Sequence, residues 1–363
     1  MAQSRHKLKR RAYLLRRARL LAQKATKFRL RRDRNRRLKY SHLRNQAETV
    51  VLPKFSEPKI ITIGVPYEFC FLTNTVRCAE FFKSLLEYEN DDTLFPYTKI
   101  KLDLSGLTSV DFAATMLLTA VGEELALRKV ILQGNRPKED ECEHYLQESG
   151  FYNQKIDDKG RRIIQPGKSS FTKVGRGEVR VEQRQLKEFY ELSVAAYKNV
   201  GNNDINLLDT HSVLIKEICG NAAEWSDSER KNWIIGSKTE PDRTVFVVLD
   251  LGVGILNSLY RKFSSQFADF FTNATDDKIL GKAFDEQYES KSKESNRNRG
   301  LPFIKKCAED GIVSELMVIS NNVRLCFDDI SQNWEFAKDK DVFAGTLYSW
   351  VVENKNNKNN IKI

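Results

Sequence analysis

Glu217 and Asn221 carry a carboxylate and an amide that could act together on one ligand. They lie four apart in the run 214–224, whose pattern predicts a helix, so both side chains project from one helix face. An amide oxygen there can ligate Mg²⁺ between phosphates, and a carboxylate can orient and deprotonate an attacking water. A plain surface pair on a helix has the same spacing, and this alternative stays open.

A second candidate group follows a strand. Residues 244–250 form an apolar, β-branched run that ends in Asp250, and Gly252 and Gly254 come directly after it. An Asp at a strand end can accept a hydrogen bond from an adenine amino group. Glycines let the backbone pass close against a base because they lack a side chain. The pattern by itself also fits an ordinary tight turn.

Two further groups lie near the end of the chain. Gly300 opens a predicted helix, so its neighbours offer free backbone N–H groups and a positive dipole end to phosphates. Arg297 and Arg299 precede it and can add charge-assisted contacts. Thr346 begins the last apolar strand, where it can hold the water that bridges Asp250 and a base. Taken alone, Gly300 with the two arginines before it also fits an ordinary basic start of a helix.

The order of these four groups resembles the N, G1, G2 and G3 boxes of the GHKL ATPases, the family of gyrase B, MutL and the histidine kinases. The resemblance covers about residues 181–352. It implies an α/β sandwich that holds ATP between helices and a mixed sheet, with Glu217 as general base and Asn221 as the Mg²⁺ ligand. The residues implied to bind ATP are Asp250, Gly252, Gly254, Arg299, Gly300, Leu301 and Thr346.

The chain departs from the family pattern at two positions. Pro302 stands where the phosphate loop has a second glycine, and proline cannot donate a backbone hydrogen bond. Trp225 stands where many relatives have histidine. Both departures bear on catalytic turnover more than on nucleotide binding.

Residues 58–154 alternate between strand and helix patterns and predict a small α/β domain with right-handed crossovers. Strands are expected at 60–65, 99–104 and 129–133, and helices at 78–88, 112–127 and 140–148. The run 101–111 with the apolar helix after it resembles the centre of a STAS domain, the fold of anti-sigma-factor antagonists. A generic α/β unit is the plainer alternative.

The STAS-like segment lacks the feature that makes its regulatory relatives switchable. In those relatives a phosphorylatable Ser or Thr follows the acidic residue at the helix start, whereas Phe112, Ala113 and Ala114 follow Asp111 here. We therefore expect a docking or dimerisation module that binds a protein partner, and a homodimer stays open.

The first 48 residues form a cationic arm. Residues 1–45 hold 18 Lys or Arg and one acidic residue, whereas the remainder holds 42 Lys or Arg against 48 Asp or Glu. The composition favours a helix. Dense guanidinium groups suit phosphate, so nucleic acid is the first expected ligand, with an acidic protein surface or a solubilising role as alternatives. The arginines expected to contact nucleic acid are Arg10, Arg11, Arg16, Arg17, Arg31, Arg32, Arg36 and Arg37.

Composition bounds the remaining possibilities. The 363 residues are 40% hydrophobic and 30% charged, which is typical of a globular protein with a real core. The sequence has no apolar run long enough to span a membrane and no secretory signal, although an Arg-rich start also fits a transit peptide. Six cysteines without a C-x-x-C pair predict reduced thiols in a cytoplasmic protein. A linker is expected at 155–180 and a disordered tail at 353–363.

Together these features predict an α/β protein that is a Mg²⁺-dependent ATPase. It would act as a nucleotide-controlled regulatory switch, with family context pointing to a bacterial regulatory or phage-defence system. The alternatives are an anti-sigma-type Ser/Thr kinase and a non-hydrolysing, nucleotide-gated scaffold that binds nucleic acid or protein. A histidine kinase is disfavoured, because His211 lies only six residues before Glu217.

Overall fold

The computed structural model describes nine ranges of the chain, all within one compact unit that begins at Pro58. The predicted arm with its arginines, most of the predicted linker and the tail after Asn354 lie outside them. The described residues are 60–88, 98–149, 151–154, 171–177, 181–225, 233–263, 274–285, 300–336 and 343–354.

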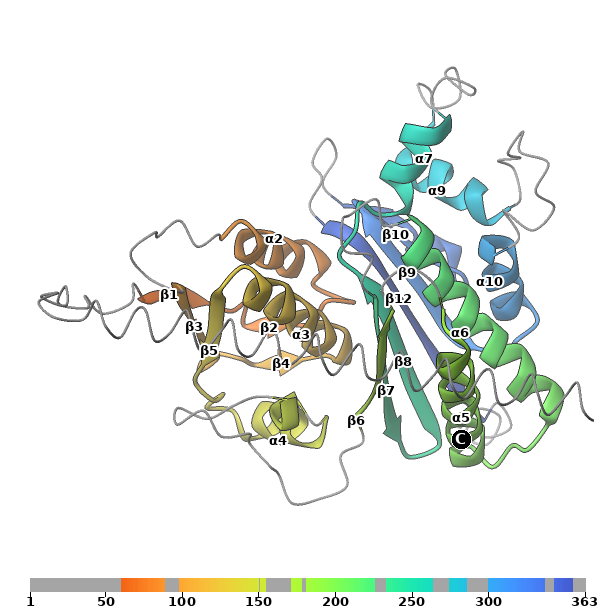
Figure 1. Cartoon of the computed structure of the whole chain (residues 1–363), viewed down its shortest axis with the longest axis horizontal. Coiled ribbons are helices and arrows are strands. Elements are labelled where there is room, and N and C mark those ends of the chain that lie inside the picture. Colours follow the sequence, from red (N-terminus) through yellow and green to blue (C-terminus); the bar gives the residue numbers. More distant parts are fainter. Residues whose placement is uncertain are drawn as a thin grey trace, which may run out of the picture. The chain divides into compact units, whose positions relative to one another are not determined.

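The first part of the unit alternates strands and helices as the sequence predicts (Figure 1). Three parallel strands form a sheet in the order β1-β3-β5, and a short pair, β2 with β4, lies beside it. The predicted bounds of α3 and α4 are confirmed to the residue. The elements are β1 (Ile60–Gly64), β2 (Glu68–Phe69), α2 (Thr75–Leu86), β3 (Thr98–Asp103), β4 (Ser109–Val110), α3 (Phe112–Leu127), β5 (Val130–Gly134), α4 (Asp140–Glu148) and η1 (Phe151–Gln154).

Helix α3 is apolar around most of its circumference because it lies between two sheets. It packs against β5 on one side and against β7 and β8 of the second sheet on the other. Asp111 fixes its start: the carboxylate accepts hydrogen bonds from the backbone N–H of Ala114 at 2.6 Å and of Leu72 at 2.8 Å. Such a cap satisfies a helix N–H that has no partner within the helix.

The second part of the unit is built on a seven-stranded sheet in the order β11-β10-β9-β12-β8-β7-β6. Every described pairing in it is antiparallel, so the mixed sheet implied by the family resemblance is wrong for these strands. The reason is local: short connections join β7 to β8 and β9 to β10 as hairpins, and β12 enters between β8 and β9 antiparallel to both. The strands are β6 (Phe171–Gly177), β7 (Trp233–Glu240), β8 (Arg243–Asp250), β9 (Ser314–Asn321), β10 (Val323–Cys326), β11 (Trp334–Glu335) and β12 (Phe343–Glu353).

Strand β6 corrects the predicted linker. Residues 171–177 pair with β7 at the edge of the sheet, with an irregular register between Val174 and Arg176. Gly175 and Gly177 hid this strand in the sequence, because glycine weakens a strand pattern and often marks a bulge. The strand depends on its neighbour in the sheet rather than on its own propensity.

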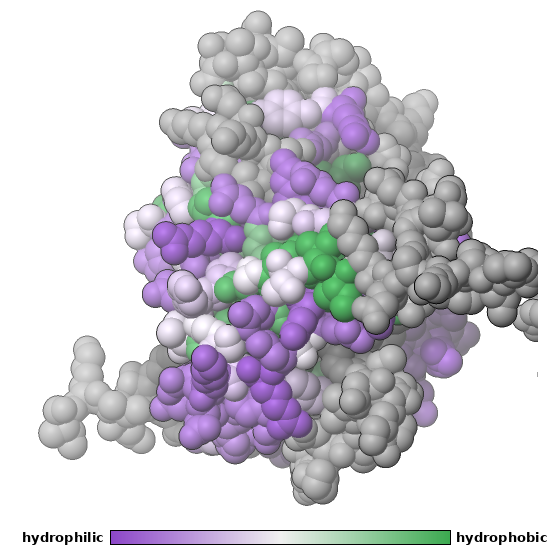
Figure 2. Space-filling view, turned by 90° about the vertical axis from the view of Figure 1, so that its left-hand side faces the viewer, coloured by the Kyte–Doolittle hydropathy of each residue, from purple (hydrophilic) through white to green (hydrophobic). Residues whose placement is uncertain are grey.

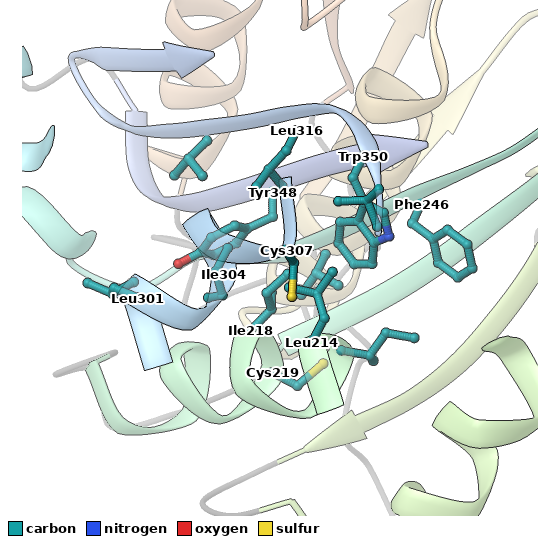
Figure 3. Close-up of a cluster of buried hydrophobic side chains, with 14 of the residues drawn as sticks. Leu214, Ile218, Cys219, Phe246, Leu301, Ile304, Cys307, Leu316, Tyr348 and Trp350 are labelled. Carbon is teal, nitrogen blue, oxygen red and sulfur yellow. The ribbon is translucent and has the colours of Figure 1, made fainter. Parts of the chain in front are cut away.

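Helices cover both faces of the seven-stranded sheet (Figure 1). On one face α5 and α6 pack together with α10, and Figure 3 shows the part of this core in which apolar side chains of α6, α10 and the strands meet. On the opposite face α2 and α3 pack against the same strands. The helices of the second part are α5 (Gln183–Asn199), α6 (Ile205–Trp225), α7 (Ile255–Phe263), α9 (Asp276–Phe284) and α10 (Gly300–Glu309), with the short η2 (Ile330–Gln332).

The outer face of the three-stranded sheet carries apolar and basic side chains. Ile60, Lys99 and Ile131 are register partners across the three strands, and Ile60 and Ile131 are exposed. Figure 2 views the molecule from the side on which Figure 1 draws this sheet and shows a hydrophobic patch surrounded by hydrophilic residues. Within the described ranges, no helix is both long enough and apolar enough to cross a membrane.

Candidate functional site

Helix α6 presents Glu217 and Asn221 toward the start of α10. The apolar face of α6 is held in the core by Leu214 and Ile218, which leaves the two polar residues at its border. A methyl group added at Gly300 would lie 3.1 Å from both the Asn221 Oδ1 and the Glu217 Oε2. The first residue of α10 therefore lies directly against both polar side chains. Only a residue without a side chain fits there without displacing them.

Asp250 is the last residue of strand β8, and it lies on the face of the seven-stranded sheet that α6 covers. It pairs in register with Thr346 of β12, and both residues are buried. The Gly252 N–H donates to the Asp250 Oδ1 at 2.8 Å. Burial raises the pKa of Asp250 to about 7, although hydrogen bonds from Gly252 and Thr346 act in the opposite direction. Burial thus favours the uncharged form of this carboxyl group more than is usual for aspartate.

The turn after Asp250 depends on Gly254 and Asn321. Gly254 has φ of +82°, and a methyl group there would collide with the Asn321 side chain. Asn321 Nδ2 donates to the Val253 carbonyl at 2.8 Å, and Asn257 N–H donates to the Asn321 Oδ1 at 3.3 Å. The sequence reading missed Asn321. Its signal was a polar residue soon after the apolar run 316–319.

A small pocket lies where these segments meet. Its volume is about 10 Å³, roughly the space that one water molecule needs. It joins residues from α6, from the turn after β8 and from β12, which are far apart in the sequence. Its lining consists of Asn221, Ala222, Asp250, Gly254, Ile255, Thr346 and Tyr348.

Two polar atoms in the pocket wall have no partner among the described residues. The Asn221 Nδ2 and the Tyr348 hydroxyl are both buried and make no hydrogen bond there. A buried polar group without a partner costs about 1–3 kcal/mol. Trp233 Nε1 in the core and Arg243 Nε also lack a hydrogen-bond partner, so among the described residues the Asn221 and Tyr348 atoms differ from these in that they line the pocket.

The structure brings together most of the residues that the sequence singled out. Asn221, Asp250, Gly254 and Thr346 line one pocket, and Glu217, Gly252, Gly300 and Leu301 border it or follow directly from its wall. Arg299 and Arg297 lie outside the described residues. Pro302 lies in the first turn of α10. A proline there costs the helix little but removes one N–H from its exposed end.

Between α7 and α10, the described residues 274–285 contain the helix α9. Ile279 and Leu280 of α9 are fully buried in the core, and Asp276 at its start accepts a hydrogen bond from Asn322 Nδ2 at 2.7 Å. Burial of two such side chains stabilises by roughly 3–6 kcal/mol relative to exposure. The middle of this segment is therefore part of the core.

His211 has a structural role. Its ring is fully buried, the Trp350 indole N–H donates to its Nε2 at 2.9 Å, and its Nδ1 lies 2.9 Å from the Ser193 hydroxyl. Because Nε2 accepts, Nδ1 carries the proton and donates to Ser193, which itself donates to the Phe189 carbonyl. Burial lowers the pKa of His211 to about 3. Because the ring is fully buried and both of its nitrogens are hydrogen-bonded, neither nitrogen is accessible to a phosphate donor in this structure.

Comparisons with protein-family models, with curated proteins and with solved structures gave no match to this chain. The described residues contain no group of three or more His, Cys, Asp or Glu side chains that could hold a metal ion. The polar groups at and beside the pocket are a carboxylate and an amide on α6, a buried carboxyl group on β8 and the first backbone N–H groups of α10.

Proposed function

We propose that this chain binds ATP with Mg²⁺ at the pocket between α6, β8, β12 and α10, and that it hydrolyses ATP as a nucleotide-controlled switch. The assignment of residues 181–352 to the GHKL type, and of 58–154 to a STAS-like module, is part of this proposal. It rests on motif order in the sequence together with the geometry of the site.

One observation carries the proposal: four sequence groups separated by up to about 130 residues meet at one place. The Glu217–Asn221 pair lies against Gly300, and Asp250 pairs with Thr346 beside the same pocket. Helical spacing within α6 accounts for the first pair alone. Nothing in an ordinary surface pair or an ordinary tight turn requires the other groups to join it.

The residues fit the parts of Mg²⁺·ATP. Asp250 is buried and can accept a hydrogen bond from the adenine amino group, with Thr346 beside it. The start of α10 offers N–H groups and a positive dipole end to phosphates. Asn221 Oδ1 would hold Mg²⁺, which favours hard oxygen ligands. When bound, Mg²⁺ offsets the charge of the phosphates, and Glu217 is placed to hold and deprotonate a water beside them.

The small volume of the pocket indicates which part of the protein would move in the proposed switch. A space of about 10 Å³ is far smaller than an adenine ring needs, so the walls must separate on binding. Glu217 and Gly300 are in close approach across α6 and α10. We therefore place the nucleotide-dependent movement at the junction between these two helices.

The test is Mg²⁺-dependent ATP binding and hydrolysis by the wild type, Glu217→Ala and Asp250→Ala. The proposal expects turnover by the wild type, binding without turnover by Glu217→Ala, and loss of binding by Asp250→Ala. Absence of nucleotide binding by the folded wild type would contradict the whole assignment.

A non-hydrolysing scaffold is the second candidate, and Pro302 is the observation that favours it. Proline removes one backbone donor from the turn that would hold phosphate. ATP binding without turnover by the wild type, also in the presence of nucleic acid, would select this candidate. A kinase acting on its own STAS-like segment has less support, because Phe112 to Thr115 at the start of α3 are buried.

Nucleic acid, or an acidic protein surface, is the proposed partner of the basic arm, and a further protein is proposed for the STAS-like module. Contacts to phosphate make affinity fall steeply with salt. Binding of the full chain to RNA and DNA oligonucleotides at two salt concentrations, beside a variant lacking residues 1–48, tests the arm. Equal affinity with and without the arm would contradict its role.

A further inference from the structure

Tyr348 occupies a position in the site that the sequence did not single out. It lies two residues after Thr346 on β12, so both side chains point to the same face of the sheet. Its ring packs in the core with Ile218 and Leu316, and it is 2% exposed. In Figure 3 its hydroxyl is directed away from Trp350, toward Leu301 in the first turn of α10. The side chain thus reaches from the sheet to the junction of α6 and α10.

The hydroxyl and the Asn221 amide are neighbours that lack partners. Both line the same pocket, and each has a buried polar atom without a hydrogen bond among the described residues. Burial raises the pKa of Tyr348, the charge of Asp250 adds to the rise, and hydrogen bonding with the Asn221 side chain opposes it. The hydroxyl and the amide therefore lie close together, although they do not have the geometry of a full hydrogen bond. The nitrogen of Asn221 is a donor and the phenolic oxygen can accept, so the two groups are chemically complementary.

The orientation of the Asn221 amide decides whether it can hold a cation. The oxygen can ligate Mg²⁺, whereas the NH₂ group cannot. Asn221 Oδ1 lies closer than Nδ2 to the position of a Gly300 methyl group, at 3.1 Å against 3.3 Å, so the amide edge faces α10 with both atoms within reach. A second group must therefore fix which atom faces the phosphates.

We propose that Tyr348 is a positioning residue for Asn221. On closure around a nucleotide, its hydroxyl accepts a hydrogen bond from Asn221 Nδ2 and so directs Oδ1 toward the Mg²⁺ position beside Gly300. The inference rests on the proposed function and assigns Tyr348 a role in metal dependence rather than in adenine recognition. No covalent step is involved.

The test measures the affinity of a non-hydrolysable ATP analogue by calorimetry, once with Mg²⁺ and once with EDTA. Tyr348→Phe removes the hydroxyl and keeps the ring. We expect its Kd with Mg²⁺ to rise about tenfold, and its Kd in EDTA to stay within about twofold of the wild type, since one hydrogen bond of about 1.4 kcal/mol corresponds to a factor of ten. Its melting temperature should not fall, because the variant loses a buried group without a partner.

Tyr197→Phe is the matched control. Tyr197 is also buried, but its hydroxyl donates to the Ile312 carbonyl at 2.7 Å, away from the pocket. This variant should lower the melting temperature by a few degrees and leave both Kd values unchanged. The two Tyr→Phe variants should therefore show opposite patterns.

A double variant tests whether Tyr348 acts through Asn221. In an Asn221→Ala background the further change Tyr348→Phe should alter the Kd with Mg²⁺ by less than about twofold. Equal weakening with Mg²⁺ and with EDTA would mean that the hydroxyl contacts the nucleotide itself, which overturns the positioning role. Wild-type affinity in Tyr348→Phe also overturns it. Absence of binding by the wild type would instead remove the proposed function, so the two failures are distinguishable.

Discussion

The two faces of the seven-stranded sheet differ in how completely their polar groups are satisfied. Strand β8 alternates between them: Val247 and Leu249 pack against α2 and α3, whereas Val248 and Asp250 face α6. The α2–α3 face is apolar and closely packed. The α6 face ends in a pocket with a raised carboxyl pKa and two buried atoms that lack partners. One strand thus packs against apolar helices on one side and forms a wall of the proposed ATP site on the other.

This difference suggests a division of labour. A face that is close-packed with apolar side chains resists deformation and holds the strand ends in register. The opposite face can then tolerate incompletely satisfied groups, because their cost of about 1–3 kcal/mol each is offset by packing elsewhere. We therefore expect variants on the α6 face to change ATP binding and variants on the α2–α3 face to change stability.

The largest effect is expected at Gly254, on the site face. Gly254→Ala places a side chain at φ of +82° and against Asn321, so the turn that follows Asp250 must shift. We expect ATP affinity to fall about 100-fold, which corresponds to roughly 2.7 kcal/mol. Calorimetry with Mg²⁺·ATP measures this. Gly281→Ala in α9 is the control, since a methyl group there meets nothing within 4 Å, and wild-type affinity is expected.

The next effect is expected at Gly236, on the opposite face. A methyl group there would lie 2.6 Å from the Met116 sulfur and 3.1 Å from the Phe112 ring of α3. Gly236→Val should overpack this contact and lower the free energy of unfolding by about 2 kcal/mol. Urea unfolding and ATP titration check it together. A tenfold loss of ATP affinity at an unchanged free energy of unfolding would show that α3 is coupled to the site. It would contradict the expected separation of binding and stability between the two faces.

A smaller effect is expected from the pH dependence of Asp250. Its folded-state pKa of about 7 lies above the ordinary value of 3.8, so its contribution to stability is full below pH 3.8 and is lost as pH rises through 7. Relative to Asp250→Asn, the wild type should lose about 1.4 kcal/mol between pH 6 and pH 8. Urea unfolding at both pH values measures the difference, and a constant difference would contradict the raised pKa.

His211 also changes stability with pH, so Asp250→Asn must be compared with the wild type at each pH. Its folded-state pKa of about 3 lies below the ordinary 6.5, so its contribution is full above pH 6.5 and is lost as pH falls toward 3. This trend is opposite to that of Asp250. Because both proteins contain His211, its contribution cancels in the comparison.

Local patterns in the sequence were sufficient for the longer elements of residues 58–154, but not for β6, which lies in the predicted linker. The apolar run 112–127 and the helical pattern of 140–148 predicted the bounds of α3 and α4, and the strand ending at Asp250 was evident from its β-branched run. Tyr348 and Asn321 were missed, because their roles arise from segments that meet only in the folded chain. The apolar character of α3 indicated burial, but not that a second sheet would cover it.

Hydrogen–deuterium exchange with and without Mg²⁺·ATP can locate the proposed ATP site on the folded chain. The account predicts slower exchange in peptides covering 217–222, 250–257, 300–305 and 345–348, and unchanged exchange in β1, β3 and β5. Protection confined to the first part of the unit, or no protection at saturating nucleotide, would contradict the placement of an ATP site between α6, β8, β12 and α10.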